Sequence, residues 1–108
     1  MPRIEVFWTE AARGDLFHII DPLRTAAPKR ADQLIARLIN AAQQLASFPE
    51  SGRRPPELLD LTALREVVVE QLRLIYQYRP EVQRVEVIAV FHSRRDIPEL
   101  LRTRLRLP

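Results

Sequence analysis

Apolar residues recur along the chain with two different periods, a helical period in the first half and a strand period in the second. At the start, Ile4, Val6 and Trp8 alternate with Glu5 and Phe7. This alternation predicts a strand with one face better buried than the other. The chain therefore opens with a strand.

Two helices are predicted after this strand. Thr9 is a suitable N-cap for the first helix, and Pro22 should disturb or end that helix because proline lacks a backbone donor. Pro28 suits the first turn of the second helix. The apolar positions of this second helix have helical spacing and are Ala31, Leu34, Ile35, Leu38, Ala42 and Leu45.

A turn-rich loop over residues 48–56 ends the second helix, and one short helical turn is expected before about residue 64. Three β-rich runs then follow, at residues 65–70, 72–78 and 84–91, which predicts a meander of three strands. Residues 79–83 resemble a hairpin loop, whereas the connection near Glu70 and Gln71 lacks glycine. Strict alternation places two sets on common faces: Leu72, Leu74, Tyr76 and Tyr78, and Val85, Val87, Ala89 and Phe91.

The last predicted element is a short C-terminal helix. Asp96 and Glu99 have the spacing of a capping box around Pro98, and Leu100, Leu101 and Leu105 follow. The order β-α-α-β-β-β predicts one α+β domain over residues 1–108, in which a two-helix hairpin packs on a small, mainly antiparallel four-stranded sheet. The opposite face of the sheet should be partly open and is a candidate site.

Composition narrows the chemistry. With 46% hydrophobic and 29% charged residues, the chain should fold as one globular domain. It contains no cysteine and only His18 and His92 as histidines, so no metal or cofactor is expected. No apolar run approaches the roughly 20 residues that span a bilayer, and the start does not resemble a signal peptide. A cytoplasmic protein without a membrane partner is expected.

The charge is concentrated at the C-terminal end. From His92 onward the chain has five arginines against two acidic residues, which accounts for the whole formal net charge of +3. Such a segment can attract nucleic acid or an acidic protein surface, or can be a solvated basic tail. The arginines are Arg94, Arg95, Arg102, Arg104 and Arg106.

Short motifs in a particular order resemble the RelE/ParE toxins along nearly the whole length. They are Trp8, Ala12 and Asp15-Leu16, then Leu45–Pro49 with Gly52-Arg53, then Leu64–Glu66, Leu72–Tyr76, Val87–His92 and Arg94–Asp96. The resemblance implies a toxin neutralised by an antitoxin encoded beside it, whose C-terminal segment wraps the toxin and occupies its groove. It also implies one of two targets. RelE-like members are ribosome-dependent endoribonucleases, and ParE-like members inhibit DNA gyrase.

A nuclease would need a base, an acid and cations around the scissile phosphate. Arg65, Arg73 and His92, with Glu66 or Tyr78, could form such a cluster. RelE-like enzymes resemble one another in a lysine-bearing active surface and a C-terminal tyrosine or histidine. The chain departs from this pattern. Its one lysine is Lys29, and its last residues, 104–108, contain no tyrosine or histidine. The turn from His92 to Asp96 resembles the ParE-like branch instead.

The resemblance to the ParE-like branch therefore implies a toxin that blocks DNA gyrase by a protein contact and needs no catalytic residue. The proposed target-binding surface consists of Arg65, Arg73, His92, Arg94, Arg95 and Arg102. The structural alternative is that Arg65 and Arg73 pair with nearby glutamates and that His92 caps its strand. A third hypothesis is a co-repressor that contacts operator DNA only through its antitoxin complex.

Overall fold

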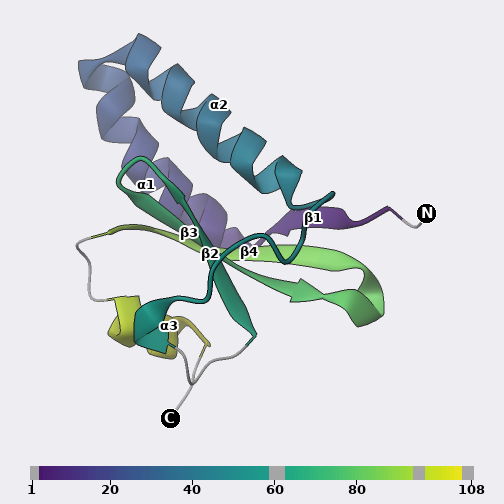
Figure 1. Ribbon diagram of the computed structural model, residues 1–108. Helices are drawn as coiled ribbons and strands as arrows, with labels where there is room; N and C mark the ends of the chain where they lie inside the picture. Colours follow the sequence, from purple (N-terminus) through teal and green to yellow (C-terminus); the bar gives the residue numbers. More distant parts are fainter. Residues whose placement is uncertain (1–2, 59–62, 94–96, 106–108) are drawn as a thin grey trace.

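The computed structural model describes residues 3–58, 63–93 and 97–105 and confirms the predicted α+β fold. A mixed four-stranded sheet has the order β1-β4-β3-β2, with β1 parallel to β4 and the other neighbours antiparallel. Figure 1 shows the helices α1 and α2 as a hairpin beside this sheet. The elements are β1 (Glu5–Trp8), α1 (Glu10–Ala26), α2 (Pro28–Gln44), η1 (Pro56–Leu58), β2 (Leu64–Val69), β3 (Leu72–Arg79), η2 (Pro80–Val82), β4 (Arg84–His92) and α3 (Ile97–Leu105).

The helical hairpin begins as the sequence predicts but turns later than Pro22. The Thr9 hydroxyl accepts a hydrogen bond from the backbone N–H of Ala12 at 3.1 Å, which caps α1. Pro22 lies inside α1, which continues to Ala26. The helix ends there because Ala27 precedes Pro28 and is held out of the helical region, at φ −153° and ψ 78°. Pro28 then opens α2.

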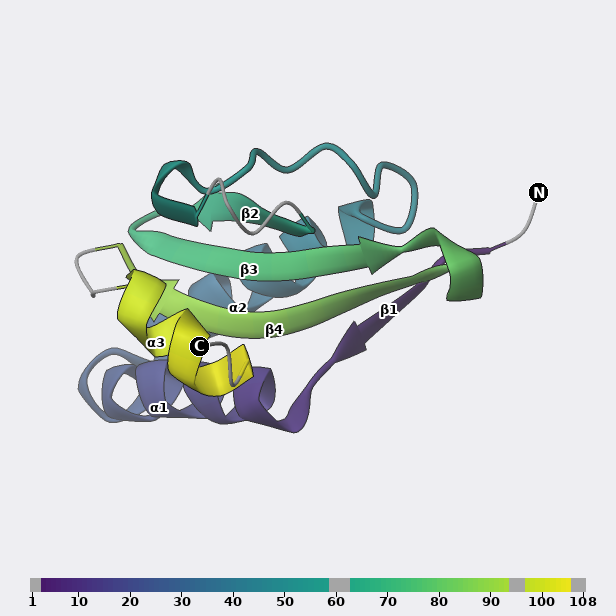
Figure 2. The ribbon, with the colours of Figure 1, turned by 90° about the horizontal axis from the view of Figure 1, so that it is seen from below.

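Two hydrophobic cores lie on opposite faces of the sheet. The larger core lies under the helical hairpin, where Leu38, Leu74, Tyr76 and Val87 are fully buried. The smaller core lies under α3, which covers the opposite face in Figure 2. It consists of Leu64, Ile75, Ile88, Ala89, Phe91 and Leu101. The face that was expected to be partly open is therefore partly closed by α3.

A bulge in β4 makes one face prediction wrong. Ile75 pairs with Ala89, but Tyr76 pairs with Val87, so Ile88 is an extra residue in the strand. An extra residue reverses the alternation of side chains beyond it. Val85 and Val87 therefore face the helical hairpin, whereas Ala89 and Phe91 face α3.

The carboxylate of Asp15 links α1, β4 and α3 at this bulge. Asp15 on α1 accepts a hydrogen bond from the backbone N–H of Val90 at 3.0 Å and forms an ion pair with Arg104 on α3. Arg104 also donates to the carbonyl oxygen of Ile88 at 3.3 Å, and its guanidinium lies 5.1 Å from the ring centroid of Phe91. This arginine of the basic C-terminal segment thus holds α3 against the sheet.

The turn between β2 and β3 has no glycine and uses Glu70 in the left-handed region, at φ 57°. Its carboxylate contacts α2, where it pairs with Arg30 and lies 3.3 Å from Arg37. The hydrogen bond to Arg30 lowers the pKa of Glu70 and raises the pKa of Arg30. An ion pair with a neighbouring helix therefore holds this turn in place.

Candidate functional site

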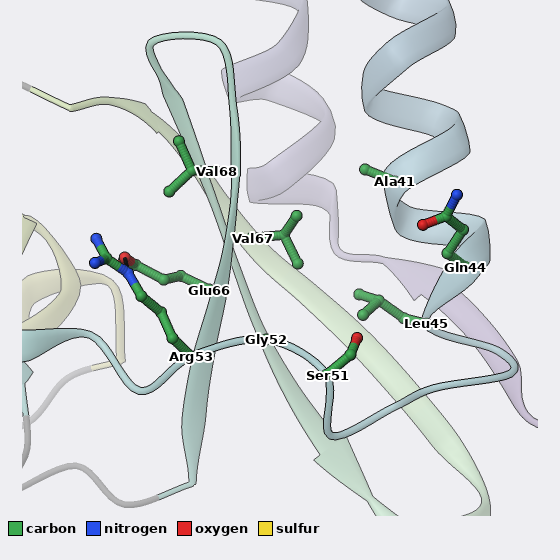
Figure 3. Close-up of a pocket in the computed structure, with 9 residues that line it drawn as sticks. All are labelled: Ala41, Gln44, Leu45, Ser51, Gly52, Arg53, Glu66, Val67 and Val68. Carbon is green, nitrogen blue, oxygen red and sulfur yellow. Dashed lines mark hydrogen bonds and ion pairs between the residues drawn. The ribbon is translucent and has the colours of Figure 1, made fainter.

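A cleft of about 440 Å³ lies between the end of α2 and the edge strand β2. Figure 3 shows side chains from both elements, and from the loop between them, around this space. The lining residues are Ala41, Gln44, Leu45, Ser51, Gly52, Arg53, Glu66, Val67 and Val68. The cleft combines an apolar helix end with the backbone of a sheet edge.

The loop that closes one end of the cleft is fixed by Tyr76. This side chain is fully buried, and its hydroxyl donates to the carbonyl oxygen of Pro49 at 2.8 Å and accepts from the N–H of Gly52 at 2.9 Å. Burial raises the pKa of Tyr76, so the phenol stays neutral and keeps its proton for Pro49. A Cβ at Gly52 would lie 2.6 Å from the Tyr76 ring, so only glycine fits this approach without displacing its neighbours.

The same loop pairs with part of the β2 edge. The N–H of Arg53 donates to the carbonyl oxygen of Glu66 at 3.0 Å, and the N–H of Glu66 donates to that of Arg53 at 2.7 Å. Alternation along a strand directs the N–H and C=O of Val68 to the same outer side as those of Glu66. No backbone pairing reaches Val68 from this side within the described residues. Val68 is half-exposed and offers a place for an added strand.

A network of charged side chains lies on the α3 face of β2 and β3, opposite the helical hairpin. The carboxylate of Glu66 is buried and accepts from Arg53 at 2.5 Å and from Arg73 at 2.5 and 2.8 Å. Arg73 also donates to both carboxylate oxygens of Glu57, at 2.5 and 2.7 Å. These hydrogen bonds lower the pKa of Glu57 to about 2 and raise the pKa of Arg73. The network joins the segment after the loop to the sheet.

The structure does not bring Arg65, Arg73 and His92 together. Arg65 lies on the face of the helical hairpin and donates to the carbonyl oxygen of Gly52 at 2.9 Å. Arg73 lies on the α3 face. His92, which pairs with Leu72, is back on the hairpin face at the other end of the sheet, beside a pocket under the helical hairpin.

The other residues of the predicted cluster and surface are placed as follows. Glu66 is engaged by Arg73, whereas Tyr78 is half-buried on the opposite face with Tyr76. Arg102 is half-buried on α3 and has interactions within the protein. Arg94 and Arg95 lie outside the described residues. In the described part of the chain, no three His, Cys, Asp or Glu side chains gather as a metal site would require, and no helix is long and apolar enough to span a membrane.

The predicted site named Arg65 and Glu66 of β2 but did not include the cleft beside this strand or the loop that closes it. A signal for the loop was present in the sequence, because Gly52-Arg53 follows Pro49 and the polar residues Glu50 and Ser51 after α2. A signal for Glu57 was absent, because its contact with Arg73 depends on how the chain returns across the sheet.

Comparisons with known proteins agree along most of the length. Residues 6–97 match the family model described as the ParE toxin of the type II toxin–antitoxin system parDE. Toxin RelE2 of Caulobacter vibrioides is 34% identical over 91 residues, which cover 84% of this chain and 97% of RelE2. Y4kP of Sinorhizobium fredii is 32% identical over 101 residues, which cover 94% of this chain and 100% of Y4kP.

Two solved structures share the fold. A chain of the chromosomal ParDE toxin–antitoxin system of P. aeruginosa superposes with a TM-score of 0.67 at 16% identity, covering 82% of this chain and 95% of that chain. A chain of the RelBE2 toxin–antitoxin complex of Mycobacterium tuberculosis superposes with a TM-score of 0.55 at 21% identity, covering 84% and 99%. Together with the family model and the relatives above 30% identity, these findings show that the chain belongs to the ParE/RelE family of toxins from type II toxin–antitoxin systems.

Proposed function

We propose that this toxin inhibits bacterial growth by binding and blocking DNA gyrase, without catalysis of its own. The observation that carries the proposal is the separation of Arg65, Arg73 and His92, the residues from which a nuclease site could have been built. A base, an acid and a phosphate-binding cation must lie within hydrogen-bonding reach of one phosphate, roughly 3 Å from the reacting atoms. Arg73 lies on the α3 face, whereas Arg65 and His92 lie at opposite ends of the hairpin face, so the three residues do not meet this condition.

The charge state of Arg73 supports the same conclusion. Its guanidinium donates to two carboxylates, those of Glu57 and Glu66, and is buried. A buried arginine between two carboxylates has its positive charge already compensated, so it has little attraction left for a phosphate. In this proposal Arg73 and Arg65 support the segments that they hold. The gyrase contact is made by His92 at the end of β4, by Arg102 on α3, and by Arg94 and Arg95, which come between these elements in the sequence.

The purified toxin is expected to block DNA supercoiling by gyrase and to leave mRNA intact on translating ribosomes. Arg102→Glu should weaken the inhibition by about tenfold, because a reversed rim charge disturbs docking on an acidic surface by roughly 1–2 kcal/mol. Lys29→Glu, an exposed charge reversal at the start of α2, is the matched control and should inhibit like the unmodified toxin. Cleaved mRNA with active gyrase would contradict the proposal and support the RelE-like alternative.

We also propose that the cleft beside β2 receives an extended segment of the cognate antitoxin. A strand added at Val68 would use the outward N–H and C=O of the sheet edge, and apolar side chains of the added segment would pack against Ala41 and Leu45. The two structural neighbours are described as toxin–antitoxin systems, which agrees with a partner of this kind. In this proposal operator DNA is contacted only through the toxin–antitoxin complex.

Val68→Pro should weaken antitoxin binding by about 10- to 100-fold, because proline removes the N–H that an added strand needs and narrows the backbone angles. Val68→Thr has a similar shape and keeps the N–H, so its affinity should stay close to that of the unmodified toxin. Calorimetric titration of toxin with antitoxin measures both. Equal affinities of the proline and threonine variants would show that the antitoxin does not pair with this edge.

A further inference from the structure

The outward face of α1 has a stripe of charged residues with one aromatic residue at its centre. Phe17 is 63% exposed, although large apolar side chains are usually covered. Two residues of each sign, all exposed, flank it on the same side of the helix, at spacings of three, four, four and three. These residues, called the α1 stripe below, are Glu10, Arg13, Phe17, Asp21 and Arg24.

Among the described residues, the α1 stripe has no charged partner. None of its four charged side chains forms an ion pair with another described residue. The ring of Phe17 contacts only the neighbouring His18 among the aromatic side chains described, edge-on at 6.2 Å between centroids. Figure 2 shows α1 at the lower border of the molecule, with no other element outside it. The stripe is therefore available to another molecule.

The order of charges along the α1 stripe indicates which kind of partner fits it. Along the stripe the signs run negative, positive, aromatic, negative, positive, so reversing the direction of the helix exchanges each charge for its opposite. The net charge of the stripe is zero, so neither an acidic surface nor a basic one is preferred. A second helix with the same pattern, running antiparallel, matches it at every position. The chain itself supplies such a helix.

We propose that this toxin forms a two-fold symmetric dimer in which α1 packs antiparallel against α1 of a second copy, with the two Phe17 rings at the symmetry axis. The register then places Arg13 opposite Asp21 of the second copy and Glu10 opposite Arg24 of the second copy. Two-fold symmetry repeats each pair, so four ion pairs surround a central aromatic contact.

The surface beside the stripe suits a close approach. An apolar groove of about 220 Å³ lies next to Phe17, with Leu16, Ile20 and Ile35 in its lining, and can take the Phe17 ring of the second copy. A Cβ at Gly14 would meet no other part of the chain within 4 Å. Inside a helix glycine is about 1 kcal/mol less favourable than alanine, and nothing in the fold of a single copy requires it here. In the proposed dimer, the absence of a side chain at Gly14 lets α1 of the second copy approach closely.

The dimer should be weak and sensitive to salt. A helix of 17 residues is about 25 Å long, so a contact along α1 falls at the lower end of the roughly 1,200–2,000 Å² buried in stable interfaces. Ion pairs at its exposed rim are screened by added salt. Association in the micromolar range or weaker is therefore expected, and it should weaken further at high ionic strength.

Sedimentation equilibrium of the full chain, from micromolar to millimolar concentration, tests the proposal by charge exchange. Arg13→Asp and Asp21→Arg should each weaken dimerisation at least tenfold, because each places like charges opposite one another twice per dimer. The double variant R13D/D21R restores opposite charges and should dimerise within about threefold of the unmodified chain. Lys29→Glu, outside the stripe, should have no effect.

Three outcomes would overturn the proposal. The first is a chain that stays monomeric up to millimolar concentration. The second is a dimer that either single reversal leaves intact, or that the double variant does not restore, which would place the interface elsewhere. The third is a Phe17→Ser variant that dimerises normally but loses antitoxin affinity, which would assign the stripe to the antitoxin. Circular dichroism of each variant separates these results from loss of the fold.

Discussion

Arg73→Met is expected to lower the free energy of unfolding by about 3–5 kcal/mol, because it leaves a buried carboxylate without its main partner. Glu66 is 1% exposed and accepts two hydrogen bonds from Arg73, and its other partner, Arg53, has a side chain that is 60% exposed. Urea denaturation measures the change. Arg79→Met, which removes an exposed pair with Glu81, is the control and should cost less than about 1 kcal/mol.

Arg73→Met should also change how the free energy of unfolding depends on pH in the acid range. Arg73 lowers the pKa of Glu57 from 4.5 to about 2, so the folded protein favours the ionised carboxylate more than the unfolded chain does. This contribution to stability is complete above pH 4.5 and is lost as the pH falls towards 2. In Arg73→Met this contribution is missing at all pH values. The difference in unfolding free energy between the variant and the unmodified protein should therefore narrow as the pH falls from 4.5 towards 2. A difference independent of pH would contradict the Arg73–Glu57 pair.

Gly52→Ala should lower the free energy of unfolding by about 2–3 kcal/mol, since a methyl group here overpacks a rigid site. It would lie 2.6 Å from the ring and hydroxyl of Tyr76 and 2.8 Å from the carbonyl oxygen of Glu66. Tyr76 cannot move aside easily, because it is fully buried and hydrogen-bonded at both Pro49 and Gly52. Thermal and urea unfolding measure the loss.

Gly14→Ala is the matched control for this substitution. Its methyl group meets no other segment, and alanine favours a helix, so the unfolding free energy of the monomer should rise by about 0.5–1 kcal/mol. Equal changes at the two glycines would show that the approach of Tyr76 to Gly52 is looser than the structure indicates.

The elements of the fold follow from local sequence signals, because each depends on neighbours along the chain. Thr9 caps α1 and Pro28 starts α2, both as expected, and the periods of apolar residues place the strands within a residue or two. Pro22, which was expected to disturb or end α1, does not end it, and the helix continues to Ala26. A proline inside a helix is a weaker stop than the residue that must leave the helical region before the next proline.

The bulge at Ile88 could not be predicted, because residues 87–91 are all apolar and give no sign of which face each one takes. The bulge also separates His92 from Arg73, two residues of the suspected cluster. After the bulge His92 lies on the hairpin face, while Arg73 stays on the α3 face. The partners of Arg73 and Asp15 lie in distant segments, and such contacts follow only from the folded topology.

The strand order affects when the sheet can form during synthesis on the ribosome. Of the four described strands, β1 leaves the ribosome first and its partner β4 leaves last, with Glu5 opposite Arg84. At about 5–20 residues per second, β1 waits on the order of 4 to 16 seconds for that partner to be synthesised. Because β4 lies between β1 and β3, the sheet cannot close earlier. The cleft beside β2 and the end of β4 therefore take their final form only after β4 has been synthesised.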